Sequence, residues 1–137
     1  MKNRKPILLV EDDEVDALTV KRALDQLKVL NELVIRQNGE EALDYLNKEE
    51  STLPCIIMLD LRMPKMGGIE FLEIVKNKQG LKGIPVIVMT SSKEETDIVN
   101  SYQLGVAGYI VKPVDYSRFV EAIRTVDVYW TLNELPT

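Results

Sequence analysis

The sequence contains no histidine and only one cysteine, Cys55, among its 137 residues. Without histidine the chain can form neither a Ser-His-Asp nor a Cys-His catalytic arrangement, and no histidine-ligated metal centre. A single cysteine excludes an intrachain disulfide, a redox-active cysteine pair and a cysteine cluster for zinc. Any chemistry therefore has to come from carboxylates, hydroxyls and lysines.

Long hydrophobic runs and an excess of positive charge are also lacking. The longest apolar runs, such as residues 7–10 and 84–89, have the length of a strand and are far too short to span a membrane. The 22 acidic residues outnumber the 17 basic ones, which is the opposite of a duplex-binding domain. The apolar stretch near the start ends at Glu11, too early for a secretory signal. We therefore expect a cytoplasmic protein that binds neither nucleic acid nor membranes.

What the chain does contain suits one globular domain covering residues 1–137. Its 45% hydrophobic residues and its length allow a sizeable core without a disulfide or a structural metal. Short apolar runs alternate with segments of helical spacing. The runs predict five strands buried on both faces, at residues 6–10, 33–36, 55–59, 85–89 and 107–111.

The four segments between these strands and the one after the last strand predict five helices. In the first, Asp13 is a candidate cap, and the expected apolar side consists of Val15, Leu18, Ala23, Leu24 and Leu27. The second follows Asn38-Gly39 and the third follows Gly67-Gly68; the last two are expected at residues 94–104 and from about residue 115. Strict alternation of strands and helices predicts an α/β fold with a doubly wound, five-stranded parallel sheet.

Polar residues collect where the strands end. They are Glu11-Asp12-Asp13, Asp60, Thr90-Ser91-Ser92 and Lys112-Pro113. Ligands of an open parallel sheet bind at the carboxyl ends of its strands, so these groups can converge on one pocket. Gathered carboxylates repel one another unless a cation joins them. Because only oxygen ligands are present, the expected cation is hard, and Mg²⁺ suits a site that also holds phosphate oxygens.

Each of these groups also has a plain structural interpretation. Acids at the start of a helix often only cap it, Thr90 could cap the following helix, and a lysine such as Lys112 is usually a solvated surface group. Asp60 is harder to explain in this way, because it directly follows a buried apolar run. Proline after Lys112 restricts the backbone and can aim the lysine side chain. Together, the four features are far more specific than any one of them.

The same residues carry a family resemblance. The motifs are Ile-Leu-Leu-Val-Glu-Asp-Asp at 7–13, Met-Leu-Asp-Leu-Arg-Met-Pro at 58–64, Pro-Val-Ile-Val-Met-Thr at 85–90 and Gly-Tyr-Ile-Val-Lys-Pro at 108–113. From about residue 5 to 126, the chain resembles a two-component response-regulator receiver domain with the (βα)5 flavodoxin-like fold. The steps of 30 residues from Asp60 to Thr90 and 22 residues from Thr90 to Lys112 fit the spacing of that family.

The resemblance implies a role for each residue of the site. Asp60 would accept a phosphoryl group from the phosphohistidine of a histidine kinase. Glu11, Asp12, Asp60 and the backbone carbonyl of Arg62 would hold Mg²⁺, whereas Asp13 is a third acid without an assigned role. Thr90 and Lys112 would contact the phosphoryl oxygens, which agrees with the electrostatic needs of phosphoryl transfer.

The resemblance also implies a switch. Tyr109 matches an aromatic residue whose rotamer follows Thr90, so phosphorylation would reshape the face formed by the expected helix at 94–104, the strand at 107–111 and the last helix. The alternative is that Tyr109 only packs at the sheet edge. Arg62 and Ser92 occupy the positions that tune the lifetime of the phosphate in the family; the direction of their effect stays open.

No output domain follows in the sequence, so we expect output through protein binding. The extended last helix and tail, about residues 115–137, resemble those of stand-alone, CheY-like receivers paired with bacterial phytochrome-type histidine kinases. The apolar residues of this tail either pack on the domain itself or form a patch for a homodimer or a kinase. The homodimer would use the same switching face and the tail.

Three other functions compete with this interpretation. A phosphatase or phosphotransferase of the haloacid dehalogenase type needs a second aspartate two residues after the nucleophile, where this chain has Arg62. A nucleotide or flavin binder needs a phosphate-binding loop after the first strand, where the three acids would repel phosphate. A phosphorylation-independent, receiver-like binding module has no feature in its favour. We therefore expect no enzyme, apart from catalysis of the protein's own dephosphorylation.

Overall fold

The computed structural model describes residues 5–48, 52–61, 65–90 and 105–111, together with Ser117 and Val120; for Thr90, Tyr109 and Val111 it describes the backbone. The elements, in chain order, are β1 (Ile7–Val10), α1 (Glu14–Gln26), β2 (Leu33–Arg36), α2 (Gly39–Leu46), β3 (Ile56–Asp60), α3 (Gly68–Lys76), β4 (Val86–Thr90) and β5 (Gly108–Val111).

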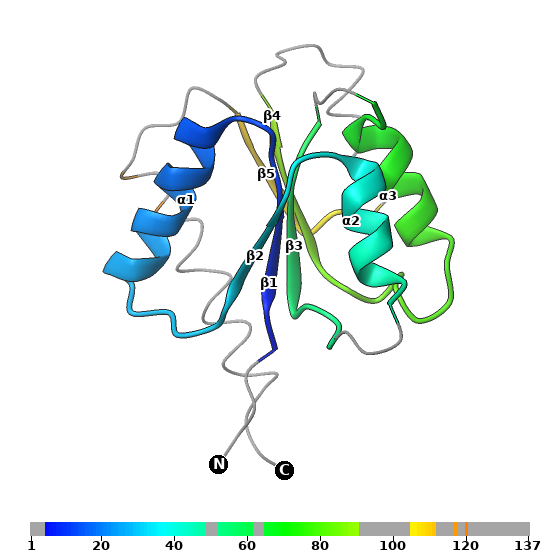
Figure 1. The fold of residues 1–137 in the computed structure, drawn as a ribbon, viewed down its shortest axis with the longest axis horizontal. Coiled ribbons are helices and arrows are strands. Elements are labelled where there is room, and N and C mark those ends of the chain that lie inside the picture. Colours follow the sequence, from blue (N-terminus) through cyan, green and yellow to red (C-terminus); the bar gives the residue numbers. More distant parts are fainter. Residues whose placement is uncertain are drawn as a thin grey trace.

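The five strands form one parallel sheet in the order β2-β1-β3-β4-β5. Helix α1 covers one face of the sheet, whereas α2 and α3 cover the other (Figure 1). The chain passes from β1 outward to β2 on one side, and β3 pairs with β1 on its other side. The predicted α/β fold with a doubly wound, five-stranded parallel sheet is therefore confirmed.

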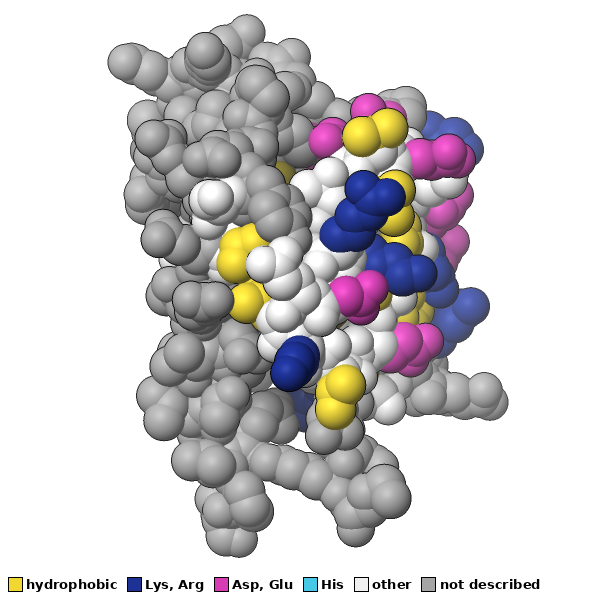
Figure 2. Space-filling view, turned by 90° about the vertical axis from the view of Figure 1, so that its left-hand side faces the viewer, with side chains coloured by type: hydrophobic (Ala, Val, Ile, Leu, Met, Phe, Trp, Pro, Cys, Tyr) yellow, Lys and Arg dark blue, Asp and Glu magenta, His cyan; other side chains and the backbone are white. Residues whose placement is uncertain are grey.

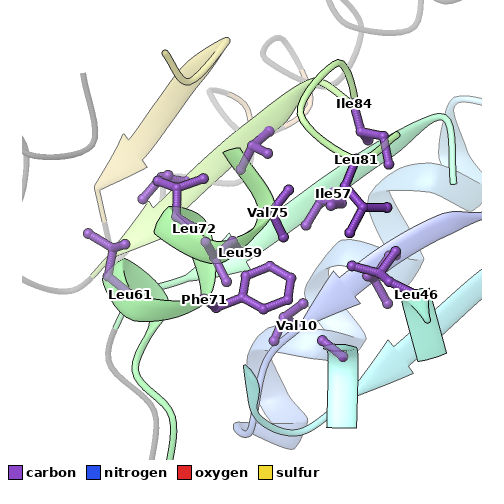
Figure 3. Packing of buried hydrophobic residues seen from close by; sticks show 14 residues of the cluster. Val10, Leu46, Ile57, Leu59, Leu61, Phe71, Leu72, Val75, Leu81 and Ile84 are labelled. Carbon is purple, nitrogen blue, oxygen red and sulfur yellow. The ribbon is translucent and has the colours of Figure 1, made fainter. Parts of the chain in front are cut away.

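The central strands are buried on both faces. Ile7 and Leu9 of β1 belong to the hydrophobic cluster under α1, and Leu8 and Val10 belong to the cluster under α2 and α3. In the second cluster, the Phe71 ring of α3 points towards Val10 (Figure 3). Because both of their faces are covered, the central strands consist of consecutive apolar residues in the sequence.

Strand β2 differs from this expectation. Its residues are only partly buried, and Ile35 is 39% exposed. The strand lies at the end of the sheet and pairs with β1. An edge strand lacks a neighbour on one side, so its side chains are less completely covered than those of β1 and β3. The prediction that all five strands are buried on both faces was therefore wrong for β2. Gly108 and Ile110 of β5, the other edge strand, are also only partly buried.

The observed strands also begin one residue later than predicted in four cases. Pro6 and Pro85 precede β1 and β4, because proline has no N–H to donate to a sheet. β3 and β4 extend to Asp60 and Thr90, so these two residues end their strands instead of following them. Both residues therefore take their backbone positions from the sheet.

Helix α1 begins as predicted but faces the sheet differently. The side chain of Asp13 caps it, as the sequence indicated. Val15 is 72% exposed and Leu18 is 44% exposed, so their assignment to the buried side was wrong. The residues that α1 buries are Ala17, Val20, Ala23 and Leu24. The two small alanines make close packing on the sheet possible, which favours this stripe over the larger side chains at 15 and 18.

The next two helices begin within one residue of the predicted places, at Gly39 and at Gly68. Asn38 caps α2, and α3 buries Phe71, Leu72 and Val75. The helices predicted at 94–104 and from residue 115 lie outside the described residues, except that Ser117 and Val120 are helical and Val120 packs in the cluster under α1. Within the described part of the chain, no helix is long and apolar enough to cross a membrane.

Candidate metal centre

Three carboxylates meet at the carboxyl ends of β1 and β3. One oxygen each of Glu11, Asp12 and Asp60 lies within 4.8 Å of the others. Glu11 and Asp60 are buried, with 2% and 4% of their surface exposed, whereas Asp12 is exposed. The structure thus brings together the three acids that the sequence predicts as side-chain metal ligands.

Asp60 is positioned by the sheet itself. It is the last residue of β3 and lies opposite Met89 of β4. The N–H of Leu61 donates to the carbonyl of Met89 at 3.1 Å, so pairing with β4 continues one residue beyond Asp60. Thr90 ends β4 at the same edge of the sheet. The backbones of the predicted acceptor and the predicted phosphate-binding threonine therefore end side by side.

Glu11 is held from two directions. Its N–H donates to the carbonyl of Arg36 at 2.9 Å, which extends the pairing of β1 with β2 beyond the strand ends. Its Oε2 accepts a hydrogen bond from the N–H of Asp13 at 3.2 Å. The first bond positions the Glu11 backbone, and the second orients its carboxylate.

Asp13 caps a helix, whereas Glu11 and Asp12 belong to the carboxylate group. Its Oδ1 accepts hydrogen bonds from the N–H groups of Val15 at 2.8 Å and Asp16 at 3.0 Å. These bonds satisfy donors that the first turn of a helix cannot satisfy internally. Asp13 therefore fixes the start of α1, which separates the third acid of the sequence motif from the carboxylate group.

Gly68 completes the geometry, and sequence reasoning assigned it no role. A Cβ at this position would lie 2.5 Å from Leu61 Cα and 2.6 Å from the carbonyl oxygen of Asp60. The N–H of Gly68 also donates to the carbonyl of Leu61 at 2.9 Å. The chain thus returns directly onto the end of β3, which only glycine permits. The Gly67-Gly68 pair at a helix start, where capping side chains are favoured, was the available signal.

The group fits a hard divalent cation. Its donors are carboxylate oxygens only, the ligands that Mg²⁺, Mn²⁺ and Ca²⁺ prefer. Three carboxylates this close together repel one another, and a bound cation offsets that repulsion. The carbonyl of Arg62, the hydroxyl of Ser92 and the ammonium of Lys112 lie outside the described residues, as do the side chains of Thr90 and Tyr109.

A hollow of about 260 Å³ adjoins the acids and lies between α1 and the end of β2, with Leu18, Lys21 and Ile35 in its lining. The face that includes α1 carries hydrophobic side chains among side chains of both charges (Figure 2). Leu18, which is 44% exposed, lines the hollow together with Glu11 and Asp12.

Comparison with known proteins gives the site a context. Residues 7–124 match the response regulator receiver domain family. The chain is 35% identical over 130 residues to response regulator Rcp1 of Synechocystis sp., covering 92% of this chain and 88% of Rcp1. The Mn²⁺-bound form of Rcp1 superposes with a TM-score of 0.82 at 35% identity, over 97% of each chain.

Two further solved structures are similar. The bacteriophytochrome response regulator RtBRR is 46% identical, with a TM-score of 0.79, over 89% of this chain and 77% of RtBRR. The phosphorylated cyanobacterial phytochrome response regulator RcpA is 36% identical, with a TM-score of 0.82, over 93% of this chain and 94% of RcpA.

Proposed function

The chain belongs to the response regulator receiver domain family and acts in phosphorelay signalling, and from this premise we propose that Asp60 is its phosphoryl acceptor. The observation that carries the proposal is the meeting of buried Asp60 with Glu11 and Asp12 at the carboxyl edge of the sheet. As a receiver domain, the protein is a signalling module that interacts with histidine kinases.

The acidic group can hold a divalent cation, and our proposal is that this cation is Mg²⁺. Glu11, Asp12 and Asp60 would supply carboxylate ligands, and Arg62 would supply its backbone carbonyl. When bound, the cation neutralises charge on the transferring phosphoryl group and on the acids around it. The Mn²⁺-bound form of the similar Rcp1 supports a divalent cation at this type of site.

In the proposed transfer, an Oδ atom of Asp60 attacks the phosphorus of the kinase's phosphohistidine. The P–N bond breaks, its electron pair stays on the histidine nitrogen, and an acyl phosphate forms on Asp60. The Thr90 hydroxyl and the Lys112 ammonium would contact the phosphoryl oxygens. Attack of water on the acyl phosphate would then restore Asp60, with Arg62 and Ser92 setting its rate, so the protein would catalyse its own dephosphorylation.

The proposed output is a change in protein binding. Phosphorylation would draw Thr90 towards the phosphate, and Tyr109 would follow it and alter the face that contains β5. That face and the tail at 115–137 would form a homodimer. The likeness to RtBRR and RcpA supports a phytochrome-type histidine kinase as the partner. We propose a cytoplasmic location for this protein, with residues 1–137 forming one receiver domain.

The experiment that tests the acceptor is an intact-mass measurement after incubation with acetyl phosphate and Mg²⁺. We expect one added phosphoryl group on the wild type and none on Asp60→Asn or in the presence of EDTA. An unmodified wild type after a rapid quench would contradict the proposal. A Tyr109→Ala variant should still accept phosphate but lose phosphorylation-dependent dimerisation, measured by sedimentation.

A further inference from the structure

The turn between β2 and α2 contributes no ligand to the acidic group, yet it touches both parts of the chain that do. At one end of the turn, the carbonyl of Arg36 accepts the hydrogen bond from Glu11 N–H at 2.9 Å. At the other end, Gly39 lies against Met66 in the turn that follows Asp60. One short segment therefore contacts both Glu11, which follows β1, and Met66, which follows β3.

The backbone conformation of Gly39 does not require glycine. The side chain of Met66 leaves no room for a Cβ at this position. The φ of Gly39 lies outside the left-handed region, and Gly39 begins α2, where alanine is the better helix former. A Cβ at Gly39 would lie 2.8 Å from Met66 Cγ and 2.9 Å from both Met66 Cβ and Sδ. Because Cβ is bonded to the backbone, a rotamer change alone cannot remove the clash.

Movement of Met66 would be passed on to Asp60. Met66 is two residues before Gly68, whose backbone lies against Leu61 and the carbonyl of Asp60 without room for a methyl group. Met66 is also partly buried and packs on the cluster under α2 and α3. The cluster limits how far the Met66 side chain can shift on its buried side, and a shift of the Met66 backbone acts through Gly68 on the end of β3.

The other side of the contact is rigid. Asn38 is 5% exposed, and its Oδ1 accepts a hydrogen bond from Glu41 N–H at 2.9 Å. The Glu41 side chain in turn accepts one from Gln37 N–H at 3.1 Å. These two hydrogen bonds link Gln37, Asn38 and Glu41 and fix the turn before α2, so crowding at Gly39 displaces Met66 and not the turn.

We propose that Gly39 and Met66 are positioning residues of the metal and phosphoryl site. Their contact sets the place of the turn after Asp60 relative to Glu11, and hence the spacing of the carboxylates that hold the cation. The inference rests on the proposed function of Asp60. Residues outside the ligand set that orient it commonly change metal affinity or activity by about 10–100-fold when replaced.

The test uses the full chain with Gly39→Ala, Met66→Ala, their double variant, and Gly83→Ala as a matched control. A Cβ at Gly83 meets no atom within 4 Å, and its φ is not left-handed. Mn²⁺ affinity is measured by calorimetry and the phosphorylation rate with acetyl phosphate by intact mass, with a thermal melt to verify folding.

We expect Gly39→Ala to weaken Mn²⁺ binding and slow phosphorylation by about tenfold, and Met66→Ala, which loosens the contact without adding an atom, by about threefold. The double variant removes Met66 Cγ and Sδ but keeps its Cβ 2.9 Å from the new methyl group, so its loss should lie between those of Gly39→Ala and Met66→Ala. Gly83→Ala should match the wild type.

Two results would overturn the inference: wild-type affinity and rate in a folded Gly39→Ala protein, or in Met66→Ala. Met66→Ala decides the question if Gly39→Ala does not fold. If the wild type itself binds Mn²⁺ but accepts no phosphoryl group, the proposed function fails, and the positioning role is judged on Mn²⁺ affinity alone.

Discussion

The turn after β1 and the turn after β3 lead from neighbouring central strands to helices. Glu11 and Asp12 lie in the first turn, and Asp60 is the strand residue from which the second turn starts. The first is held by side chains, because Asp13 caps α1 and Glu11 accepts the N–H of Asp13. The described part of the second turn depends on a close backbone contact for which a side chain would leave no room. Gly67 caps α3 without a side-chain hydrogen bond, and Gly68 lies on the backbone of Leu61.

This difference determines what each turn tolerates. A polar cap that accepts hydrogen bonds from helix N–H groups can be replaced by another polar side chain, with a modest change in the free energy of unfolding. A backbone-to-backbone contact has no such substitute, because any added atom overlaps with atoms that cannot rotate away. The site is therefore adaptable on the Glu11 side and rigid on the Asp60 side.

The largest effect is expected for Gly68→Ala. The new methyl group would collide with Leu61 Cα and the Asp60 carbonyl, so the free energy of unfolding should fall by about 3 kcal/mol and phosphorylation should be lost. Urea unfolding and intact mass with acetyl phosphate measure both. Gly83→Ala is the control and should change stability by less than about 1 kcal/mol. A Gly68→Ala protein as stable as this control would contradict the contrast between the turns.

The next effect separates the two acids of the first turn. Glu11→Ala removes a buried acceptor of the Asp13 N–H, so it should lower the free energy of unfolding by about 2 kcal/mol and also abolish the stabilisation by Mg²⁺. Asp12→Ala should abolish that stabilisation while changing the metal-free stability by less than about 0.5 kcal/mol, because Asp12 is exposed. Thermal melts with Mg²⁺ and with EDTA distinguish these outcomes; equal metal-free stabilities would argue against distinct roles.

Much of this site could be predicted from the sequence, for a definite physical reason. Parallel strands end at one edge, so acids that follow separate apolar runs, such as Asp12 and Asp60, must come together. Whether an acid caps a helix or faces the group depends on its side-chain direction, which the sequence does not encode locally. The sequence suggested that Asp13 caps α1, but only the structure shows that it does not also join the carboxylate group.

The errors in the fold have a similar origin. The helix containing Val15 and Leu18 offers two apolar stripes, and the helical period alone cannot decide which one faces the sheet. The structure shows that the stripe with the small alanines Ala17 and Ala23 faces the sheet, where it can pack more closely than the larger side chains. The contact of Gly39 with Met66 joins residues 27 positions apart, and no local pattern indicates it.

A smaller effect tests the first turn directly. Asp13→Ala removes the acceptor of two α1 N–H groups and should lower the free energy of unfolding by about 1 kcal/mol. Asp13→Ser keeps a capping oxygen and should restore most of this loss. Because Asp13 lies outside the carboxylate group, Mn²⁺ affinity by calorimetry should change less than threefold in either variant. A tenfold loss of affinity in Asp13→Ser would make Asp13 part of the metal centre.

The smallest effect has the opposite sign and lies in the second turn. Lys65 is exposed and has a φ of 63°, a left-handed conformation that strains residues with a Cβ by about 1 kcal/mol. Lys65→Gly removes this strain but gives the unfolded chain more freedom, so a net gain of about 0.5 kcal/mol is expected. Lys65→Ala keeps the Cβ and should leave stability unchanged in urea unfolding. If the two variants were equally stable, strain would not matter at Lys65. If Lys65→Gly is more stable, adding a Cβ at Gly68 and removing one at Lys65 act in opposite directions on the part of this turn that the structure describes, because backbone conformation at Lys65 and backbone contact at Gly68 determine its stability.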